Sequence, residues 1–264
     1  MSPVHVSLAR GLVMLALAAL MLPQEAAAER LITSLSNHRV SVSSNFVGDE
    51  VVLFGSVELD KGATPRQQPY DLVVTVIGPR NNERTRRKQR VLGIWMNVDS
   101  RAFIDVPSYL VSLSNRPVAA IADELTRRRL QLGVENTMLP QKIGPDVADV
   151  VRDDPFRKAF IRLKTERDLY LEIPNGVTFF TPTLFRATIP LPANAPIGTY
   201  EIDAELFNEG KPIARGNSAL EVIKVGFEQY VATAAVNDGI LYGLLTSLMA
   251  LVTGWLASIV FRRD

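Results

Sequence analysis

Two adjacent carboxylates, Asp49 and Glu50, directly follow Gly48 in the first quarter of the chain. Paired carboxylates can share a proton or bind a metal ion, provided that both side chains point into one site. Consecutive side chains of a strand point to opposite faces, however, and Gly-Asp is typical of a turn. We therefore expect Asp49 and Glu50 to form a turn between two strands rather than a catalytic pair.

Histidine and cysteine chemistry is limited by the composition. The chain of 264 residues has no cysteine and two histidines, His5 and His38. This excludes thiolate nucleophiles, thiolate metal sites and disulfides. A Ser-His-Asp triad would depend on His38 alone if a leader carrying His5 is removed. The sequence therefore predicts no catalytic residue, no metal site and no cofactor, and we do not expect an enzyme.

The strongest local charge is basic and lies between residues 80 and 90, where only Glu83 opposes it. We expect these cations to crowd one loop that contacts an anionic ligand, an acidic partner or anionic lipid headgroups, with a solvated loop as the simplest alternative. Nucleic acid is not expected as a partner, because we place the loop outside the cytoplasm. The candidate contact residues are Arg80, Arg84, Arg86, Arg87, Lys88 and Arg90.

The two ends of the chain predict its topology. Residues 1–28 have the pattern of a signal peptide: Arg10 precedes a short apolar stretch, and an A-x-A pattern ends at Ala28. This pattern predicts cleavage before Glu29, with an uncleaved anchor as the alternative. After cleavage, the exported chain stays attached to the bilayer only if it contains a second membrane-spanning segment.

That second signal lies at the C-terminus. Residues 239–261 contain no charged side chain, and as a helix they extend about 34 Å, enough to cross a hydrocarbon core of about 30 Å. Tyr242 and Trp255 lie towards the ends of this segment, where aromatic rings favour the membrane interface, and Arg262 and Arg263 follow it. We predict a single-pass protein of the inner (cytoplasmic) membrane, with a periplasmic N-terminal domain and a cytoplasmic tail at 262–264.

Between these ends, apolar residues recur at every second position in several segments. Val51, Leu53 and Val57 alternate with polar residues, and Tyr200, Ile202 and Ala204 do so later in the chain. About seven short strands separated by turns predict a mainly β fold, an immunoglobulin-like antiparallel β-sandwich formed by residues 29–114 and 173–226. The strands before and after Gly48 are expected to form its first hairpin.

Particular residues of the predicted sandwich can be assigned. Gly198-Thr199-Tyr200 resembles a tyrosine corner, in which the hydroxyl binds a backbone group a few residues upstream. Trp95 is a candidate for a core tryptophan. Further core candidates near the first hairpin are Phe46, Val51, Leu53 and Phe54.

The apolar period changes between the two β regions. Asn115 is a candidate helix cap ahead of Pro117, and Asp154 precedes Pro155 as a cap precedes a first helical turn. Apolar residues follow each of these positions at helical spacing. We therefore predict an α-helical insertion at 115–172, and a short stalk at 227–238 before the transmembrane helix at 239–261.

Several segments together carry a resemblance to a known family. They are NHRVSVSSNFVGDEVVLFGSVE, DLVVTVIGPR, RRKQRVLGIWMNV, VPSYLVSLSNRP, LFRATIPLPANAPIGTYEIDAELFNEG, KVGFE and YGLLTSLMALVTGWLASIVFRR. Taken in order, they resemble the alphaproteobacterial transmembrane protein family Alph_Pro_TM over almost the whole chain after the signal. The resemblance implies a C-terminally anchored envelope protein and a role beside a sulfite-exporter-like permease. It implies no catalytic residues.

Three functions remain open at this point. The first is a membrane-anchored periplasmic accessory or interaction protein, whose partners are the lipid bilayer and a polytopic membrane protein such as a permease. The second is an envelope domain that binds an anion or another small ligand through the basic segment. The third is an envelope hydrolase that uses two carboxylates, which must lie about 5 to 9 Å apart in a cleft.

Overall fold

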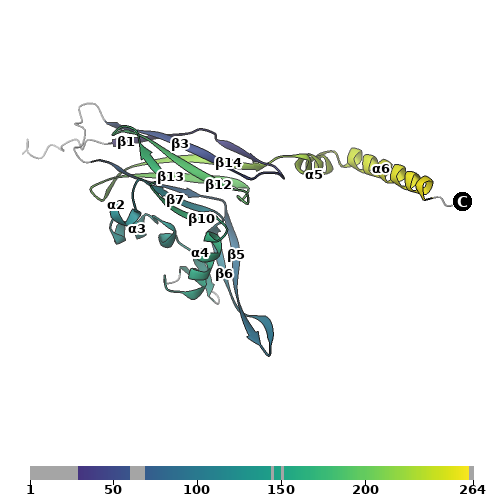
Figure 1. The fold of residues 1–264 in the computed structure, drawn as a ribbon, viewed down its shortest axis with the longest axis horizontal. Coiled ribbons are helices and arrows are strands. Elements are labelled where there is room, and N and C mark those ends of the chain that lie inside the picture. The colour runs from purple at the N-terminus through teal and green to yellow at the C-terminus, as the bar shows by residue number, and fades with distance from the viewer. Residues whose placement is uncertain (1–28, 60–68, 144–145, 150–151, 262–264) are drawn as a thin grey trace, which may run out of the picture.

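The fold is that of a computed structural model, which describes residues 29–59, 69–143, 146–149 and 152–261. The predicted signal peptide at 1–28 and the tail residues Arg262 and Arg263 lie outside the described residues. The described chain is mainly β, with a few short helices and one long apolar helix at the C-terminal end (Figure 1).

Two sheets form the main body. The first sheet has the order β1-β3-β12-β11, and all its pairs are antiparallel. The second has the order β10-β7-β4-β13-β14-β2. The strands of the first sheet are β1 (Glu29–Leu35), β3 (Gly48–Leu59), β11 (Val177–Phe179) and β12 (Leu184–Pro192). Those of the second are β2 (Arg39–Val42), β4 (Asp71–Ile77), β7 (Leu110–Ser114), β10 (Tyr170–Pro174), β13 (Gly198–Asn208) and β14 (Lys211–Lys224).

The second sheet differs from the predicted antiparallel arrangement at both edges. Strand β10 pairs with β7 in parallel, and β2 pairs with β14 in parallel. Parallel neighbours need a long crossover connection, and the segment between β7 and β10 supplies one. The expected hairpin around Gly48 is also wrong, because β2 belongs to the second sheet and β3 pairs with β1 in the first.

The inner faces of the two sheets share one hydrophobic core. Val51, Leu53 and Val57 of β3 belong to the same buried cluster as Leu72 and Val74 of β4. Strand periodicity explains this, because alternate residues point to the same face. The core prediction fails for one further residue of β3, Phe54, which directly follows Leu53, points to the outer face and is 44% exposed.

Two further residues, Phe46 and Tyr200, lie as the sequence predicts. Phe46 packs against the edge of the core. The hydroxyl of Tyr200 donates to the carbonyl of Pro196 at 2.6 Å, the bond expected of a tyrosine corner.

A third sheet extends from this body. Its order is β5-β6-β8-β9, and its strands are β5 (Arg80–Val91), β6 (Ile94–Pro107), β8 (Pro140–Ile143) and β9 (Asp146–Asp149). The predicted basic loop is therefore wrong, since its cations lie on a strand. Nearly all residues of β5 are exposed on both faces of the ribbon, so the alternation that reveals a half-buried strand is absent.

The insertion lies against the outer face of the second sheet (Figure 1). Val118 and Ile121 of its first helix, together with Leu132 from the segment after its second helix, pack onto Val73 and Phe207 of that face. It is only partly helical, because β8 and β9 belong to it. Its helical elements are α2 (Val118–Ile121), α3 (Glu124–Arg129), the 3-10 turn η1 (Val134–Asn136) and α4 (Pro155–Thr165).

The predicted helix starts have different outcomes. Asp154 caps α4 by accepting from the backbone N–H of Arg157 at 2.8 Å, with Pro155 in the first turn. Asn115 caps nothing: its side chain accepts from the backbone N–H of Leu72 and donates to Asp71, so it joins the insertion to β4.

The chain ends in α5 (Phe227–Asn237) and α6 (Gly239–Val260), which extend away from the body (Figure 1). The two helices are interrupted at Asp238, whose backbone is not helical (φ −121°, ψ 45°). Helix α6 has 22 residues and a mean hydropathy of 1.8, and it is the one helix in the described chain long and apolar enough to cross a membrane. No part of it is buried against the body.

Candidate functional site

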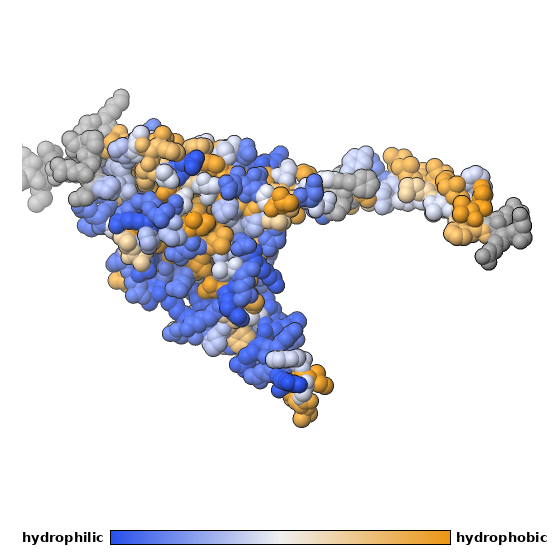
Figure 2. Space-filling view, viewed as in Figure 1, coloured by the Kyte–Doolittle hydropathy of each residue, from blue (hydrophilic) through white to orange (hydrophobic). Residues whose placement is uncertain are grey.

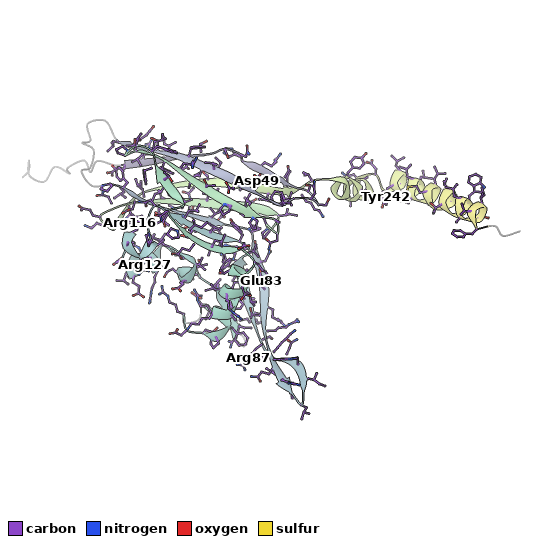
Figure 3. The ribbon with its side chains drawn as sticks, viewed as in Figure 1. Asp49, Glu83, Arg87, Arg116, Arg127 and Tyr242 are labelled. Carbon is purple, nitrogen blue, oxygen red and sulfur yellow. The ribbon has the colours of Figure 1, made fainter. Side chains whose placement is uncertain are left out.

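The β5–β6 hairpin is the most prominent feature of the surface. All six predicted contact cations, Arg80 to Arg90, are exposed along β5. Arg87 has one nearby acid, with Asp99 3.7 Å away across the ribbon, and both side chains are about half exposed. Figure 3 shows Arg87 on the narrow part of the hairpin, away from the body. The structure therefore places the cations together, but on a projecting strand.

The turn at the end of this hairpin has two residues with positive φ. Leu92 has a φ of 49° and Gly93 a φ of 88°. A two-residue turn of type I′ requires such angles, and Asn-Gly is its usual sequence. Leucine in this conformation costs roughly 1–2 kcal/mol because its Cβ approaches the following carbonyl. The tip therefore carries a residue that turn formation alone does not favour.

Apolar side chains surround this turn. The expectation that Trp95 is a core residue is wrong, because Trp95 is paired with Arg90 near the tip and is 69% exposed. Figure 2 shows an apolar end on an otherwise hydrophilic projection. Leu92 is the most exposed residue of the group, at 99%. The exposed apolar residues of the tip are Val91, Leu92, Ile94, Trp95, Met96 and Val98.

A buried lysine holds the base of the hairpin. The ammonium of Lys164, on α4, donates to the carboxylate of Glu83 at 2.5 Å and to the carbonyl of Ser108 at 3.1 Å. It also lies over the rings of Phe160 and Tyr170, at 5.5 and 5.7 Å from their centroids. Lys164 is only 7% exposed, so α4 and β5 are joined by a charge pair that is largely removed from water.

Aromatic packing completes this base. Phe103 of β6 is fully buried and stacks on Phe160 at 4.4 Å between ring centroids. The hydroxyl of Tyr170 donates to the carbonyl of Pro107 at 2.7 Å, and burial raises the pKa of this hydroxyl above its usual range. The hairpin thus has a fixed base and an exposed tip.

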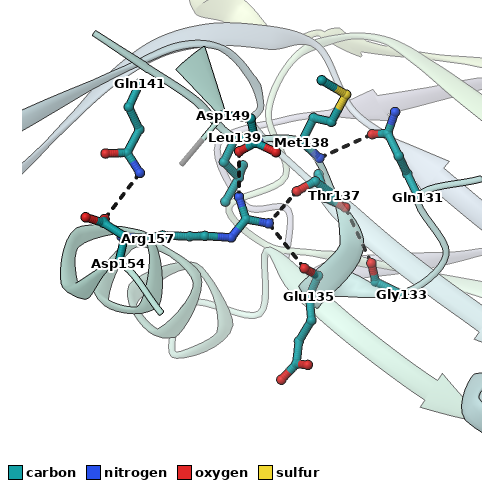
Figure 4. Close-up of polar contacts among 10 residues, drawn as sticks. All are labelled: Gln131, Gly133, Glu135, Thr137, Met138, Leu139, Gln141, Asp149, Asp154 and Arg157. Atoms are coloured by element: carbon teal, nitrogen blue, oxygen red, sulfur yellow. Dashed lines mark hydrogen bonds and ion pairs between the residues drawn. The ribbon is translucent and has the colours of Figure 1, made fainter. Parts of the chain in front are cut away.

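A second buried cation of α4 fixes the insertion (Figure 4). Arg157 is 3% exposed. Its guanidinium donates to Asp149 at 2.9 Å, to the carbonyl of Glu135 at 3.2 Å and to that of Thr137 at 2.6 Å. Sequence patterns alone did not predict a role for Arg157 or Lys164. The signal that could have done so is their helical spacing with Phe160, which places both cations on the apolar stripe of α4.

A polar cleft of about 280 Å³ lies between β13 and the insertion. Arg215 donates to Asp203 at 2.8 Å and lies 3.2 Å from Glu205. Burial raises the pKa of Glu205, the charge of Asp203 adds to this, and Arg215 opposes it. Residues 129–132 form the cleft together with the charged face of β13, on which Glu205 is buried and Glu201 is exposed.

The adjacent carboxylates of β3 do not form a site. Asp49 and Glu50 are both exposed, and Asp49 accepts from the backbone N–H of Glu50 at 2.8 Å. Asp49 and Glu50 lie within β3 and pair with Leu191 and Pro190 of β12, so the turn predicted at these two carboxylates is wrong. Gly48, which begins the strand, has the positive φ (112°) that glycine permits. His38 is exposed too. Within the described residues, no three His, Cys, Asp or Glu side chains are grouped as metal ligands.

Helix α6 has one face of small residues. Gly239, Gly243, Ser247, Ala250 and Gly254 recur at spacings of three or four, so they align along the helix. The predicted anchor residues Tyr242 and Trp255 lie on the same helix, near its two ends (Tyr242 in Figure 3).

The architecture defines a class of protein: a membrane protein with a mainly β body and one C-terminal candidate span. The model of the family described as "Putative transmembrane protein (Alph_Pro_TM)" matches residues 30–263. The chain belongs to this family, as the sequence resemblance indicated. Among curated proteins, none matches the chain.

Proposed function

We propose that this is a single-pass protein of the inner membrane, with its body in the periplasm and its C-terminus in the cytoplasm. In the sequence, Arg262 and Arg263 follow α6 after Phe261, and Asp238 precedes it, which supports this orientation by the positive-inside rule. A C-terminal fluorescent-protein fusion should fluoresce, and a C-terminal alkaline phosphatase fusion should be inactive. An active phosphatase fusion would show that the C-terminus lies in the periplasm and would reject this orientation.

We further propose that the body is an immunoglobulin-like sandwich. The shared core of its two sheets and the bond from Tyr200 to Pro196 support this assignment. In such domains edges and loops commonly serve as contact surfaces on a rigid scaffold, which fits an interaction role.

The function that the geometry supports best is a non-catalytic accessory protein of a polytopic membrane protein, such as a sulfite-exporter-like permease. The observation that carries this proposal is the small-residue face of α6 beginning at Gly239 and Gly243, on a helix left uncovered by the rest of the described chain. In lipid, helices associate through faces of small residues, because these let two backbones approach closely.

Purification from membranes in mild detergent tests this proposal. The wild-type chain should retain a polytopic partner, and the double variant Gly243→Leu/Gly254→Leu should lose it because leucine separates the helices. Val252→Leu, on the opposite face of α6, is the matched control and should retain the partner. Recovery of the wild-type chain alone, or only with a second copy of itself, in several detergents would reject the proposal.

A second candidate function is the binding of a small ligand in the cleft beside β13. Its charged lining consists of the guanidinium groups of Arg80, Arg129 and Arg215 and the carboxylates of Glu201, Asp203 and Glu205. Calorimetry with sulfite and sulfate provides the test: heat that Arg129→Gln abolishes supports binding, and absence of heat rejects it for these anions. Exposed Arg86→Gln, on the hairpin, is the control.

The hydrolase hypothesis needs two carboxylates in one cleft, and the cleft beside β13 offers Asp203 and Glu205. Arg215 bonds both Asp203 and Glu205, so both carboxylates already have a fixed cationic partner. This arrangement favours a structural role for the pair, and we therefore rank a hydrolase below the accessory protein.

A further inference from the structure

We propose that the tip of the β5–β6 hairpin inserts into an anionic lipid bilayer, namely the bilayer in which α6 is anchored. The body would then contact the membrane at two points. This inference uses the membrane location of α6 and does not depend on the partner proposed for that helix.

The composition of the tip is the first argument. Six of the eight residues from Val91 to Val98 are apolar, and all six are exposed. Exposed apolar clusters on a soluble surface generally mark a contact with a partner or a membrane. The body also exposes single large apolar residues, such as Ile32, Phe54 and Phe180, but within its described residues only the tip has six of them within eight positions.

The conformation of Leu92 is the second argument. Leu92 is 99% exposed and holds a left-handed backbone angle that asparagine or glycine adopts more easily. A side chain that contacts nothing in its own chain and occupies an unfavourable position contributes little to folding. Its place at the outermost point of the hairpin makes it the first residue to meet another surface.

The arrangement of charge is the third argument. Lys88 and Arg90 pair with Asn97 and Trp95, directly behind the turn. Across residues 80–107 there are seven cations and three acids, a net charge of +4, whereas the whole chain carries +1. Cations directly behind an apolar tip match anionic headgroups above a hydrocarbon layer. Tryptophan at this boundary is typical of the membrane interface.

The shape of the tip favours lipid over a protein groove. On one face of the ribbon Val91 pairs with Ile94, and on the other face Trp95 pairs with Arg90. Apolar atoms therefore surround the ribbon near the turn instead of lining one side of it. A bilayer accepts such an end from every side, whereas a groove on a protein partner would match a single apolar face.

The free part of the hairpin is longer than the helix that separates the body from α6. Beyond the last pair of β6 with β8, at Ala102 and Lys142, the seven residues Thr85–Val91 of β5 extend about 23 Å. The eleven residues of α5 extend about 16 Å as a helix. Figure 1 shows the hairpin and α6 leaving the body in different directions, so the contact requires a bend at Gly226 or Asp238.

Fluorescence of Trp95 in the full-length chain tests the proposal. The chain has two tryptophans, so Trp255→Phe leaves Trp95 as the only one and keeps an aromatic ring in α6. This protein is reconstituted into vesicles of phosphatidylcholine alone or mixed with phosphatidylglycerol. We expect blue-shifted emission and quenching by brominated lipid in the mixed vesicles. We expect a smaller effect in phosphatidylcholine, or when about 1 M salt shortens the Debye length to about 3 Å.

Two variants and a second vesicle population sharpen the test. Leu92→Asn suits the turn and should keep the fold, but lose most of the quenching of Trp95. Lys88→Gln/Arg90→Gln should lose only the part that depends on phosphatidylglycerol. Brominated lipid placed only in separate, protein-free vesicles should not quench Trp95, because the tip contacts its own bilayer.

Three results would overturn the proposal. Solvent-like emission of Trp95 without quenching in mixed vesicles would show that the tip stays in water. Quenching only from the separate vesicles would place the contact on a facing bilayer. A blue shift that appears in native membranes, but in no lipid vesicle, would identify a protein as the occupant. None of these results bears on whether α6 retains a polytopic partner.

Discussion

Lys164 on α4 and Glu83 on β5 form a charge pair of 2.5 Å across two elements that are far apart in the sequence. The lysine side chain is 8% exposed and the glutamate side chain 32%. The pair fixes the point where the hairpin leaves the body, so the direction of the hairpin depends on it. A projecting arm can present its tip in a defined position only if its base is held in this way.

Lys164→Met should therefore destabilise the body. Breaking a buried pair typically costs about 3–5 kcal/mol, because one charge loses its partner. Glu83 retains contact with water, so we expect a loss of about 2 kcal/mol in the free energy of unfolding, measured by urea denaturation in detergent micelles. Lys158, on the same helix, forms an exposed pair with Asp153. Lys158→Met removes this pair and should change the free energy of unfolding little. Equal effects of the two substitutions would contradict this role of Lys164.

Arg157→Lys tests the network in Figure 4. Lysine keeps the charge but has no planar fork, so it cannot donate to Asp149 and to two carbonyls in the same geometry. Hydrogen bonds of charged groups contribute about 1.5–3 kcal/mol each, and we expect a loss of about 2 kcal/mol. Amide hydrogen exchange at residues 134–137 should accelerate. Arg162→Lys, exposed on the same helix, should leave exchange there unchanged.

The pH dependence of stability should reveal Glu205. Burial raises the pKa of this carboxyl in the folded protein above its ordinary value of 4.5. The folded state therefore holds the proton to higher pH than the unfolded state. The stabilising contribution of the Glu205 carboxyl is complete below pH 4.5, and it is lost as the pH rises through the raised pKa.

The measurement compares Glu205→Gln with wild type by thermal unfolding from pH 4 to neutral. The difference in Tm, variant minus wild type, should increase with pH above 4.5, because glutamine does not ionise. Glu201→Gln, on the same strand, is the matched control. A difference in Tm that stays constant with pH would mean that Glu205 does not titrate with a raised pKa.

The parts of the fold that the sequence could predict are those in which one strand face is buried. Strands β3 and β13 show apolar periodicity because their inner faces share the core. The cap at Asp154 was predictable for a different reason, since capping chemistry is local. The apolar C-terminal segment needs only length and composition to identify it.

The parts that could not be predicted depend on distant partners or lack a buried face. Strand β2 pairs with β14 through residues such as Arg39 and Glu221, which are 182 apart in the sequence. The hairpin exposes both of its faces, so its cations indicated a loop and Trp95 indicated a core residue. The cations of the candidate site were identified individually, but the exposed apolar tip beside them was not.

Leu92→Asn should stabilise the hairpin locally. Asparagine tolerates the left-handed conformation, so about 1 kcal/mol of backbone strain should be relieved. Hydrogen exchange at the amides of Val91 and Ile94 should slow. Gly93→Ala should have the opposite effect, because Gly93 has a φ of 88°, which strains an alanine even though an added Cβ would meet nothing within 4 Å. Faster exchange in both variants would show that the turn has another conformation.

Gly55→Ala tests the close approach of β3 and β12 inside the body. A Cβ at Gly55 would lie 2.7 Å from the carbonyl oxygen of Ile32 and would meet the ring of Phe185, which is fully buried. Neither neighbour can move freely, and overpacking of a core typically costs about 1–3 kcal/mol. We expect a loss near the upper end of this range in urea denaturation.

Gly216→Ala is the matched control for this substitution. A Cβ there would lie 3.1 Å from a methyl of Thr33 and 3.3 Å from one of Leu31, and both are ends of side chains that can adjust. The reduced entropy of the unfolded chain offsets part of the strain, by about 0.4–1 kcal/mol. Gly216→Ala should therefore change stability by less than Gly55→Ala does. If the two variants were equally stable, the ring of Phe185 would not pack against Gly55, and the pairing of β3 with β12 would need revision.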